Sequence, residues 1–195
     1  MKPRSHPGGA RPGEVRLIGG QWKRSKLPVL NRPGLRPTPD RLRETLFNWL
    51  GQDLAGWRCL DAFAGSGALG FEAASRGATA VTLLEQDPAL VAALHASRER
   101  LDATALQVQR ADALDWMRCA APASFELVLL DPPFDAELHE AALAAAAPLV
   151  VPGGLIYVES GTPTMAWPAQ LEPWREARAG AVHVKLLRRS YTESA

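Results

Sequence analysis

Cysteine is scarce and long apolar runs are absent in this chain of 195 residues. The two cysteines, Cys59 and Cys119, lack the spacing of metal ligands and lie in apolar surroundings typical of small buried residues, so we expect neither a disulfide nor a bound metal. No run of about 18 apolar residues is present, and residues 1–7 lack the apolar segment of a signal peptide. The sequence therefore predicts a soluble cytoplasmic protein with no membrane partner.

The net charge is also small, at +1, but the charges are unevenly distributed. Residues 1–46 contain eleven Lys and Arg against three Asp and Glu, whereas residues 47–195 contain eleven against eighteen. A basic arm on an acidic body favours a polyanionic partner such as nucleic acid, because binding phosphates releases counterions. The alternative is a disordered solubilising tail, which fits residues 1–13 better than the segment Val15–Leu30.

Two short elements are expected before the main sheet begins. Val15–Lys23 alternates apolar and polar residues and turns at Gly19-Gly20, which predicts a hairpin within a basic extension over residues 14–37. In the helix that follows, Thr38 is expected to be the cap and Pro39 the first residue. Its buried stripe and its end are expected at Leu42, Leu46, Trp49, Leu50 and Gly51.

The remaining pattern, from residue 57 onward, is a series of βαβ units. Strands are expected near 58–62, 80–85, 105–110 and 125–130, and helices near 67–76, 88–102, 112–120 and 136–147. Leu155–Glu159 continues the sheet, and residues 171–178 and 182–189 around Gly180 form a closing antiparallel pair. The sequence thus predicts an α/β domain over residues 38–195, with a mostly parallel sheet covered by helices on both faces.

Four residues directly after the apolar run 125–130 carry the strongest chemical signal. Asp131, Pro132, Pro133 and Phe134 lie at the carboxyl end of a predicted strand, where open α/β sheets place ligand sites. The carboxylate can accept a hydrogen bond from an exocyclic amine, the prolines hold neighbouring carbonyls in place, and the phenyl ring can cover a planar base. A nucleobase amine fits this clamp. The alternative is a helix cap followed by a stiff turn.

A glycine-rich loop follows the first strand of the series. Gly65, Gly67 and Gly70 form G-x-G-x-x-G, and Glu85 ends the next strand, where a carboxylate could bind ribose hydroxyls. An NAD-dependent oxidoreductase is therefore a serious alternative. Asp61 argues against it, because a carboxylate four residues before the first glycine would point toward the pyrophosphate.

A cationic cofactor without phosphate would suit Asp61 better. S-adenosylmethionine carries a sulfonium and an ammonium, and Asp112 after the third strand offers a carboxylate for the adenine amine, with Ala113 against the ring. Ordinary helix caps at Asp87 and Asp112 are the alternative. The expected cofactor-binding residues are Asp61, Ala62, Phe63, Gly65, Gly67, Glu85, Gln86, Asp112 and Ala113.

With these residues assembled, the chain resembles the class I S-adenosylmethionine-dependent methyltransferases, and within them the bacterial 16S ribosomal RNA guanine-N2 methyltransferase family. The resemblance runs from about Val15 to Arg189 and rests on four stretches: Arg16–Lys23, Leu35–Leu50, Asp61–Gly70 and Asp131–Phe134. It implies a Rossmann-like seven-stranded sheet with a C-terminal antiparallel hairpin. It also implies methylation of one guanine N2 in 16S rRNA, within the small ribosomal subunit or an assembly intermediate. We expect the protein to be a monomer.

In that reading the guanine is extruded from its stack and held against Phe134, with N2 pointing at the donor methyl and Asp131 accepting its proton. The Thr38-Pro39 pair differs from the Thr-Thr expected of the family, at a point placed outside this chemistry. The basic arm Arg16–Arg43 would hold RNA, although each charge taken singly could be a solvated surface group. The expected phosphate contacts are Lys23, Arg24, Lys26, Arg36 and Arg41.

Other functions stay open on these residues alone. The clamp does not distinguish adenine, cytosine and guanine amines, so a DNA adenine amino methyltransferase is the leading alternative. A protein glutamine methyltransferase would more usually carry Asn-Pro-Pro-Tyr. From other classes, an NAD-binding oxidoreductase and a noncatalytic RNA-binding assembly factor are to be considered. His95 and His139 lie on predicted helices and are assigned no role, and Trp22 could stack on RNA or pack in the core.

Overall fold

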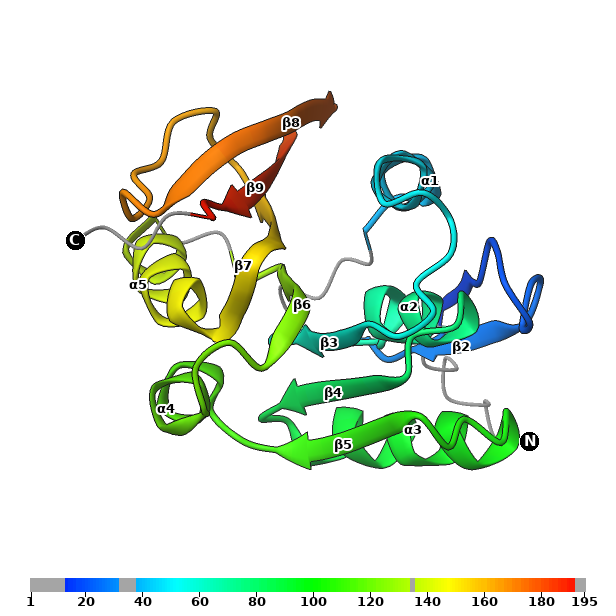
Figure 1. Cartoon of the computed structure of the whole chain (residues 1–195). Helices are drawn as coiled ribbons and strands as arrows, with labels where there is room; N and C mark the ends of the chain where they lie inside the picture. Colours follow the sequence, from blue (N-terminus) through cyan, green and yellow to red (C-terminus); the bar gives the residue numbers. More distant parts are fainter. Residues whose placement is uncertain (1–12, 32–37, 134–135, 192–195) are drawn as a thin grey trace, which may run out of the picture.

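A seven-stranded sheet and a separate two-stranded hairpin make up the fold (Figure 1). The structure is a computed structural model that describes residues 13–31, 38–133 and 136–191. The large sheet has the order β5-β4-β3-β6-β7-β9-β8, with β7 paired in parallel to β6 and antiparallel to β9. Its strands are β3 (Arg58–Asp61), β4 (Ala80–Glu85), β5 (Leu106–Arg110), β6 (Phe125–Leu130), β7 (Val150–Ser160), β8 (Leu171–Ala179) and β9 (Val182–Arg189).

Two hydrophobic clusters cover the two faces of this sheet. Successive strand residues alternate between them: Cys59 belongs to one cluster and Leu60 to the other, as expected where both faces of a parallel sheet are buried. The first cluster takes side chains from α1, α2 and α3, and the second from α4 and α5. The helices are α1 (Asp40–Trp49), α2 (Ala68–Ser75), α3 (Pro88–Arg100), α4 (Ala113–Cys119) and α5 (Ala136–Ala146), the last continued by the 3₁₀ turn η1 (Ala147–Leu149).

The strand order reverses between β3 and β6. From β3 the chain builds β4 and β5 on one side, and it then crosses to β6 on the other side of β3. Open α/β sheets bind ligands in the crevice at such a switch point, beyond the carboxyl ends of the strands. Asp61 is the last residue of β3 and pairs with Leu129 of β6, two residues before Asp131. The fold therefore brings both predicted acidic residues to one edge, and the predicted α/β architecture is confirmed.

The N-terminal hairpin consists of β1 (Gly13–Arg16) and β2 (Lys26–Val29), paired antiparallel with Val15 opposite Leu27. Val15 and Leu27, together with Leu17 in the connection, are buried in the cluster that also contains α1 and α2 side chains. The predicted turn at Gly19-Gly20 is part of a longer connection over residues 17–25, in which Gly20 has φ +71°. The hairpin therefore packs on the domain rather than extending from it.

The start of α1 departs from the sequence prediction. The helix begins at Asp40, one residue after Pro39, and no side chain caps it. Thr38 is not the cap, because its hydroxyl donates to Glu159 at the end of β7 instead. Leu42, Leu46 and Leu50 are buried as expected, and Gly51 has φ +84° beyond the helix end. Trp49 is only partly buried, whereas two residues that the pattern did not select, Arg43 and Phe47, are fully buried.

The cysteines and the absence of long apolar runs can also be compared with the sequence predictions. Cys59 is buried in the sheet, but Cys119 is exposed at the last residue of α4, so its predicted burial is wrong. Neither cysteine is part of a disulfide. Among the residues that the structure describes, no helix is long and apolar enough to span a bilayer. Residues 1–12, Arg36 and Phe134 lie outside the described ranges, so the predictions on them are not addressed by the structure.

Candidate active site

Asp61 is a buried carboxylate with one unpaired oxygen. It is 1% exposed, and its Oδ2 accepts a hydrogen bond from the Gly70 N–H at 2.9 Å. Its Oδ1 is buried and has no hydrogen-bond partner. Burial raises the pKa of Asp61 to about 7, against the lowering effect of the Gly70 N–H, and the nearby Glu85 and Glu159 raise it further. An unpaired buried carboxylate oxygen is costly, which makes Asp61 a candidate for binding a cationic ligand.

The glycines of the loop are required by close packing. Gly67 has φ +80°, and a Cβ there would lie 2.6 Å from the Leu94 side chain. A Cβ on Gly70 would lie 2.2 Å from Leu83 and 3.0 Å from the Asp61 carboxylate. Gly70 is therefore fixed both by its neighbour on β4 and by the amide that it presents to Asp61. The loop conformation and the placement of Asp61 depend on the same residues.

Glu85 ties the glycine loop to the start of α3. Its Oε2 accepts from the Gly65 N–H at 2.9 Å, and its Oε1 accepts from the N–H groups of Gln86 at 2.7 Å and Asp87 at 2.9 Å. The Gln86 side chain in turn donates to Asp112 Oδ2 at 2.6 Å. The three predicted cofactor residues Glu85, Gln86 and Asp112 thus form one connected group beyond the ends of β4 and β5.

Asp87 and Asp112 are helix caps, as the alternative interpretation holds. Asp87 caps α3 through the Ala89 N–H at 2.7 Å, and Asp112 Oδ1 caps α4 through the Asp115 N–H at 2.9 Å. Capping does not consume the acceptor capacity of Asp112, since each carboxylate oxygen can accept two hydrogen bonds. An adenine contact at Asp112 stays a prediction. Of the remaining predicted cofactor residues, Ala62 and Ala113 are buried and Phe63 is partly buried.

These residues fit S-adenosylmethionine better than a dinucleotide. Asp61 lies close enough to Glu85 and Glu159 for their charges to raise its pKa. The charges of Asp61 and Glu159 raise the pKa of Asp131 in the same way. A pyrophosphate beside four carboxylates would be repelled, whereas an ammonium or sulfonium would be attracted. The unpaired Asp61 Oδ1 is the acceptor that such a cation would satisfy. Within the described ranges, no group of His, Cys, Asp and Glu side chains is arranged to hold a metal ion.

Asp131 follows β6 at the switch point. Its side chain is largely withdrawn from solvent, and burial together with the charges of Glu159 and Asp61 raises its pKa well above the usual value. A carboxylate with a raised pKa is a better proton acceptor than an exposed one. Pro132 behind it is buried and Pro133 is exposed. Asp131 and the two prolines thus directly follow the carboxyl end of β6, and their role as a clamp stays a prediction.

A polar cluster around Glu159 was missed by the sequence analysis. Glu159 is 3% exposed, and its Oε1 accepts from the Thr38 hydroxyl at 2.7 Å and from the Tyr157 hydroxyl at 2.9 Å. The ring of His139, which is also buried, hydrogen-bonds the Glu159 carbonyl through Nε2 at 2.8 Å. Thr38 Oγ1 lies 3.5 Å from Asp131 Oδ2. Thr38 therefore lies beside Asp131, although the sequence analysis gave it no role there.

The sequence did contain one signal for this cluster. Glu159 follows the apolar run Leu155–Val158, so it lies near the carboxyl end of a strand. Leu130 of β6 pairs with Val158 of β7, which puts Asp131 and Glu159 at neighbouring positions along the edge. A second acidic residue one strand away from Asp131 could have been noted on that basis. The roles of Thr38 and His139 could not, because they depend on tertiary contacts.

The N-terminal hairpin is fastened to α2, the helix that follows the glycine loop. Glu72 on α2 accepts from the Ile18 N–H at 2.9 Å, and the Ser75 hydroxyl donates to the Gly19 carbonyl at 2.7 Å. Trp22 packs edge-on against Phe71 at 6.5 Å between ring centroids and donates its backbone N–H to Ser75 Oγ. The packing interpretation of Trp22 is the one that the structure shows.

A buried ion pair reinforces this attachment. Arg43 on α1 is fully buried, lies 3.6 Å from Glu72, and donates to the Arg16 carbonyl at 2.9 Å. Arg76 at the end of α2 donates to the other oxygen of Glu72 at 2.9 Å. Glu72 therefore contacts Arg43 of α1 through an ion pair, and it accepts hydrogen bonds from Arg76 and from the hairpin, all largely shielded from water.

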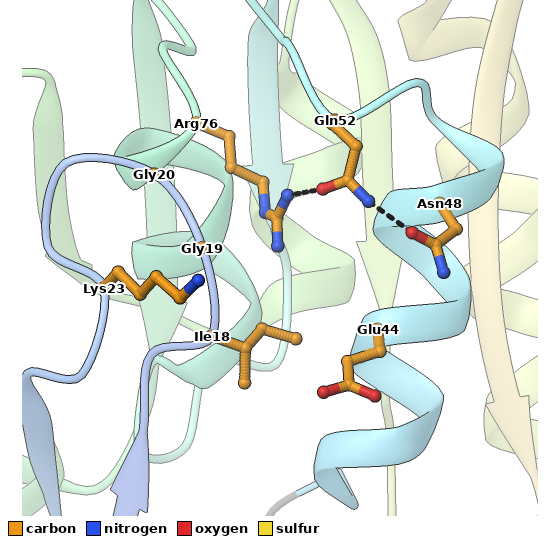
Figure 2. Close-up of a pocket in the computed structure, with 8 residues that line it drawn as sticks. All are labelled: Ile18, Gly19, Gly20, Lys23, Glu44, Asn48, Gln52 and Arg76. Atoms are coloured by element: carbon orange, nitrogen blue, oxygen red, sulfur yellow. Dashed lines mark hydrogen bonds between the residues drawn. The ribbon is translucent and has the colours of Figure 1, made fainter.

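A groove lies between the connection of the hairpin and α1, and Figure 2 shows its residues. Lys23 extends along the groove from the hairpin side, and Asn48 and Gln52 face it from α1 and its end. Arg76 donates to Gln52, which donates to Asn48, so the polar groups on that wall are already paired with one another. The groove is polar and open. Arg76 in its lining is the C-cap of α2, and neither Asp61 nor Asp131 lines the groove.

The described residues predicted to contact RNA are on the surface. Lys23, Arg24, Lys26 and Arg41 are exposed, and Lys26 is paired with Glu14 at 2.6 Å. Such exposed pairs contribute little to stability and are easily exchanged for a phosphate. RNA contact at these exposed side chains stays a prediction.

Comparison with known proteins identifies the family. A family model described as "Conserved hypothetical protein 95" matches residues 15–188. Ribosomal RNA small subunit methyltransferase D of Escherichia coli strain K12 is 42% identical over 195 residues, which cover 97% of this chain and 96% of that protein. The protein of the same name in Haemophilus influenzae is 45% identical over 153 residues, covering 76% of this chain and 79% of that protein.

Solved structures agree with this assignment. A provisionally named methyltransferase from Escherichia coli has a TM-score of 0.82 at 41% identity, over 92% of this chain and 100% of that one. A provisionally named methylase from Haemophilus influenzae has a TM-score of 0.76 at 36% identity, over 91% and 99% of the two chains. The resemblance noted from the sequence is confirmed, and the chain belongs to the ribosomal RNA methyltransferase family that these relatives represent.

Proposed function

We propose that the protein transfers a methyl group from S-adenosylmethionine to the exocyclic N2 of one guanine in 16S rRNA of the small ribosomal subunit. The observation that carries this proposal is the pair Asp61 and Asp131 at the switch point: Asp61 has an unpaired buried oxygen that suits a cationic ligand, and Asp131 follows β6 as a carboxylate with a raised pKa, which suits a proton acceptor. The relatives named ribosomal RNA small subunit methyltransferase D support the RNA substrate.

Asp61 and the group around Glu85 would hold the cofactor. Asp61 Oδ1 is suited to the methionine ammonium, Glu85 to ribose hydroxyls, and Asp112 to the adenine amine, beside the small Ala113. When bound, S-adenosylmethionine supplies a methyl group activated by positive sulfur. The protein then has to position an acceptor nitrogen in line with that methyl and to exclude water, and no strong base is needed before the new bond begins to form.

Asp131 would orient the acceptor and take its proton. A carboxylate oxygen that accepts N2–H holds the amine with its lone pair toward the methyl, and it receives the proton as that nitrogen becomes positively charged. Pro132 and Pro133 restrict the backbone that carries this carboxylate. Phe134, which lies outside the described residues, would cover the base. The guanine has to leave its stack to reach this position.

The N-terminal hairpin and α1 would bind the RNA backbone. Lys23, Arg24, Lys26 and Arg41 are exposed cations on or beside these elements and can contact phosphates without reading sequence. Arg36 is proposed for the same role on its sequence alone. In this proposal the enzyme acts as a monomer in the cytoplasm, on the assembled subunit or on an assembly intermediate.

The test is methyl transfer by the purified protein. Small ribosomal subunits, free 16S rRNA and a DNA duplex are each incubated with S-adenosylmethionine carrying a labelled methyl group, and the modified base is mapped. We expect N2-methylguanine at one position of 16S rRNA, and we expect S-adenosylmethionine but not NAD to bind. Label in DNA adenine would replace the proposed substrate, and NAD binding would replace the proposed reaction.

A further inference from the structure

We infer that Glu159, acting through the Thr38 hydroxyl, is a positioning residue that makes Asp131 the proton acceptor of the reaction. The inference rests on the function proposed above and adds two residues to it. Neither belongs to the glycine loop or to the Asp131–Phe134 clamp. Both are nevertheless among the few polar side chains that are buried in the described residues, at 3% exposure for Glu159 and 5% for Thr38.

Three side-chain oxygens, from Glu159, Thr38 and Asp131, lie in a row. Thr38 Oγ1 is 2.7 Å from Glu159 Oε1 and 3.5 Å from Asp131 Oδ2. A hydroxyl has a single proton, and the shorter distance assigns it to Glu159. The lone pairs of Thr38 Oγ1 then remain available to accept. The Asp131 carboxyl, when it is protonated, is in position to donate to them.

This arrangement favours the protonated form of Asp131, which is the form that methyl transfer produces. As the bond from N2 to the methyl carbon forms, the bond from carbon to sulfur breaks and its electron pair stays on sulfur. N2 then gives a proton to Asp131 and becomes a neutral secondary amine. The new Asp131 O–H can donate to Thr38, which continues to donate to Glu159. The 3.5 Å contact is expected to shorten at that point, as catalytic hydrogen bonds often do.

Glu159 must stay ionised to have this effect. Burial raises its pKa, but the Thr38 and Tyr157 hydroxyls and the positive charge of Arg43 oppose that rise. A buried negative charge beside Asp131 stabilises the protonated form of Asp131, since two adjacent carboxylates do not both ionise readily. The charged and titratable groups that face Asp131 are Asp61 on β3 and Glu159 and Tyr157 on β7, and those that face Glu159 include Arg43 on α1 and His139 on α5.

The first test is the pH dependence of single-turnover methyl transfer. In Glu159→Gln and in Thr38→Val, we expect the rate at the plateau to fall by about tenfold, and the acidic limb to move to lower pH by about one unit. The KM for RNA and the affinity for S-adenosylmethionine should not change. Thr38→Ser, which keeps the hydroxyl, should restore both features, and Glu176→Gln on β8 is the matched surface control. An unmoved acidic limb in folded Glu159→Gln protein would overturn the inference.

The second test does not need activity. The carboxyl carbon of Asp131 is titrated by NMR in the full chain and assigned by its loss in Asp131→Asn. Its midpoint should fall by about one pH unit in Glu159→Gln and not in Glu176→Gln. The same midpoint in both variants would refute the coupling even if methyl transfer is confirmed. If the protein modifies no guanine while the midpoint does fall, the proposed reaction fails and the coupling stands.

Discussion

Replacing Asp61 by asparagine is expected to stabilise the protein at neutral and basic pH while abolishing cofactor binding. In the folded state the pKa of Asp61 is raised to about 7, chiefly by burial, from an ordinary value of 3.8. Between these two values the folded state keeps a proton that the unfolded state has lost. The free energy of unfolding therefore falls as the pH rises from about 4 to about 7, and the full cost is present above pH 7.

The magnitude follows from the difference between the two pKa values. A shift from 3.8 to about 7 spans roughly three pH units, and each unit corresponds to about 1.4 kcal/mol. The wild-type protein should thus carry a penalty of about 4 kcal/mol at pH 8 that is almost absent at pH 4. Asparagine has no charge at either pH, and its amide oxygen can still accept from the Gly70 N–H.

Urea unfolding of both proteins at pH 4.5 and pH 8 measures this difference. We expect the Asp61→Asn variant to be more stable by about 4 kcal/mol at pH 8 and to differ little at pH 4.5. A hundredfold excess of S-adenosylmethionine over its Kd should stabilise the wild type by about 2.7 kcal/mol and the variant much less. Asp115→Asn, an exposed change on α4, should shift stability by less than about 1 kcal/mol at either pH. A gain in Asp61→Asn that is absent at pH 8, or equal at the two pH values, would refute the reasoning.

Three further predictions follow from the site and from the attachment of the hairpin. Asp131→Ala should lose most methyl transfer and keep S-adenosylmethionine affinity by calorimetry; near-normal turnover would remove Asp131 from the mechanism. Glu72→Ala should lower the free energy of unfolding by about 3 kcal/mol, because it removes the carboxylate paired with Arg76 and leaves buried Arg43 with the half-exposed Asp40 as its counter-charge, whereas Glu126→Ala, at a more exposed pair, should cost about 1 kcal/mol or less. Lys23→Gln combined with Arg41→Gln should reduce the slope of RNA affinity against salt by about 1.5, and an unchanged slope would argue against phosphate contacts there.

The sheet and its helices could be predicted because their signals are local. Apolar runs bounded by turn residues predict β4 and β6 with their observed ends. The alternation of these runs with helical patterns predicts that the strands are parallel. The positions of Asp61 and Asp131 at the same edge follow from that order alone. These parts of the fold and of the candidate site require no knowledge of which side chains meet.

The parts that were missed or wrong depend on contacts between distant residues. Thr38 has the sequence signature of a helix cap, but a partner 121 residues away takes its hydroxyl. Arg43 reads as a surface charge on an amphipathic helix, and only the tertiary structure shows its burial against Glu72. Glu159 ends a strand as visibly as Asp131 does, yet without the pairing of β6 and β7 nothing connects the two. Local sequence patterns predict helices and strands, whereas the positions and partners of residues such as Thr38, Arg43 and Glu159 depend on contacts with distant parts of the chain.

The attachment of the hairpin to α2 limits how the hairpin could be exchanged in evolution or in design. The polar contacts of the hairpin with α2 are made by backbone groups of residues 18, 19 and 22, whereas the side chains of Val15, Leu17 and Leu27 contribute apolar packing. The side chains that make these polar contacts are Glu72 and Ser75, which belong to α2, the helix after the glycine loop. A chimera that receives only the hairpin would lack the α2 side chains that bind it. A transplant would have to include the C-terminal turn of α2 and the arginine of α1 that pairs with it.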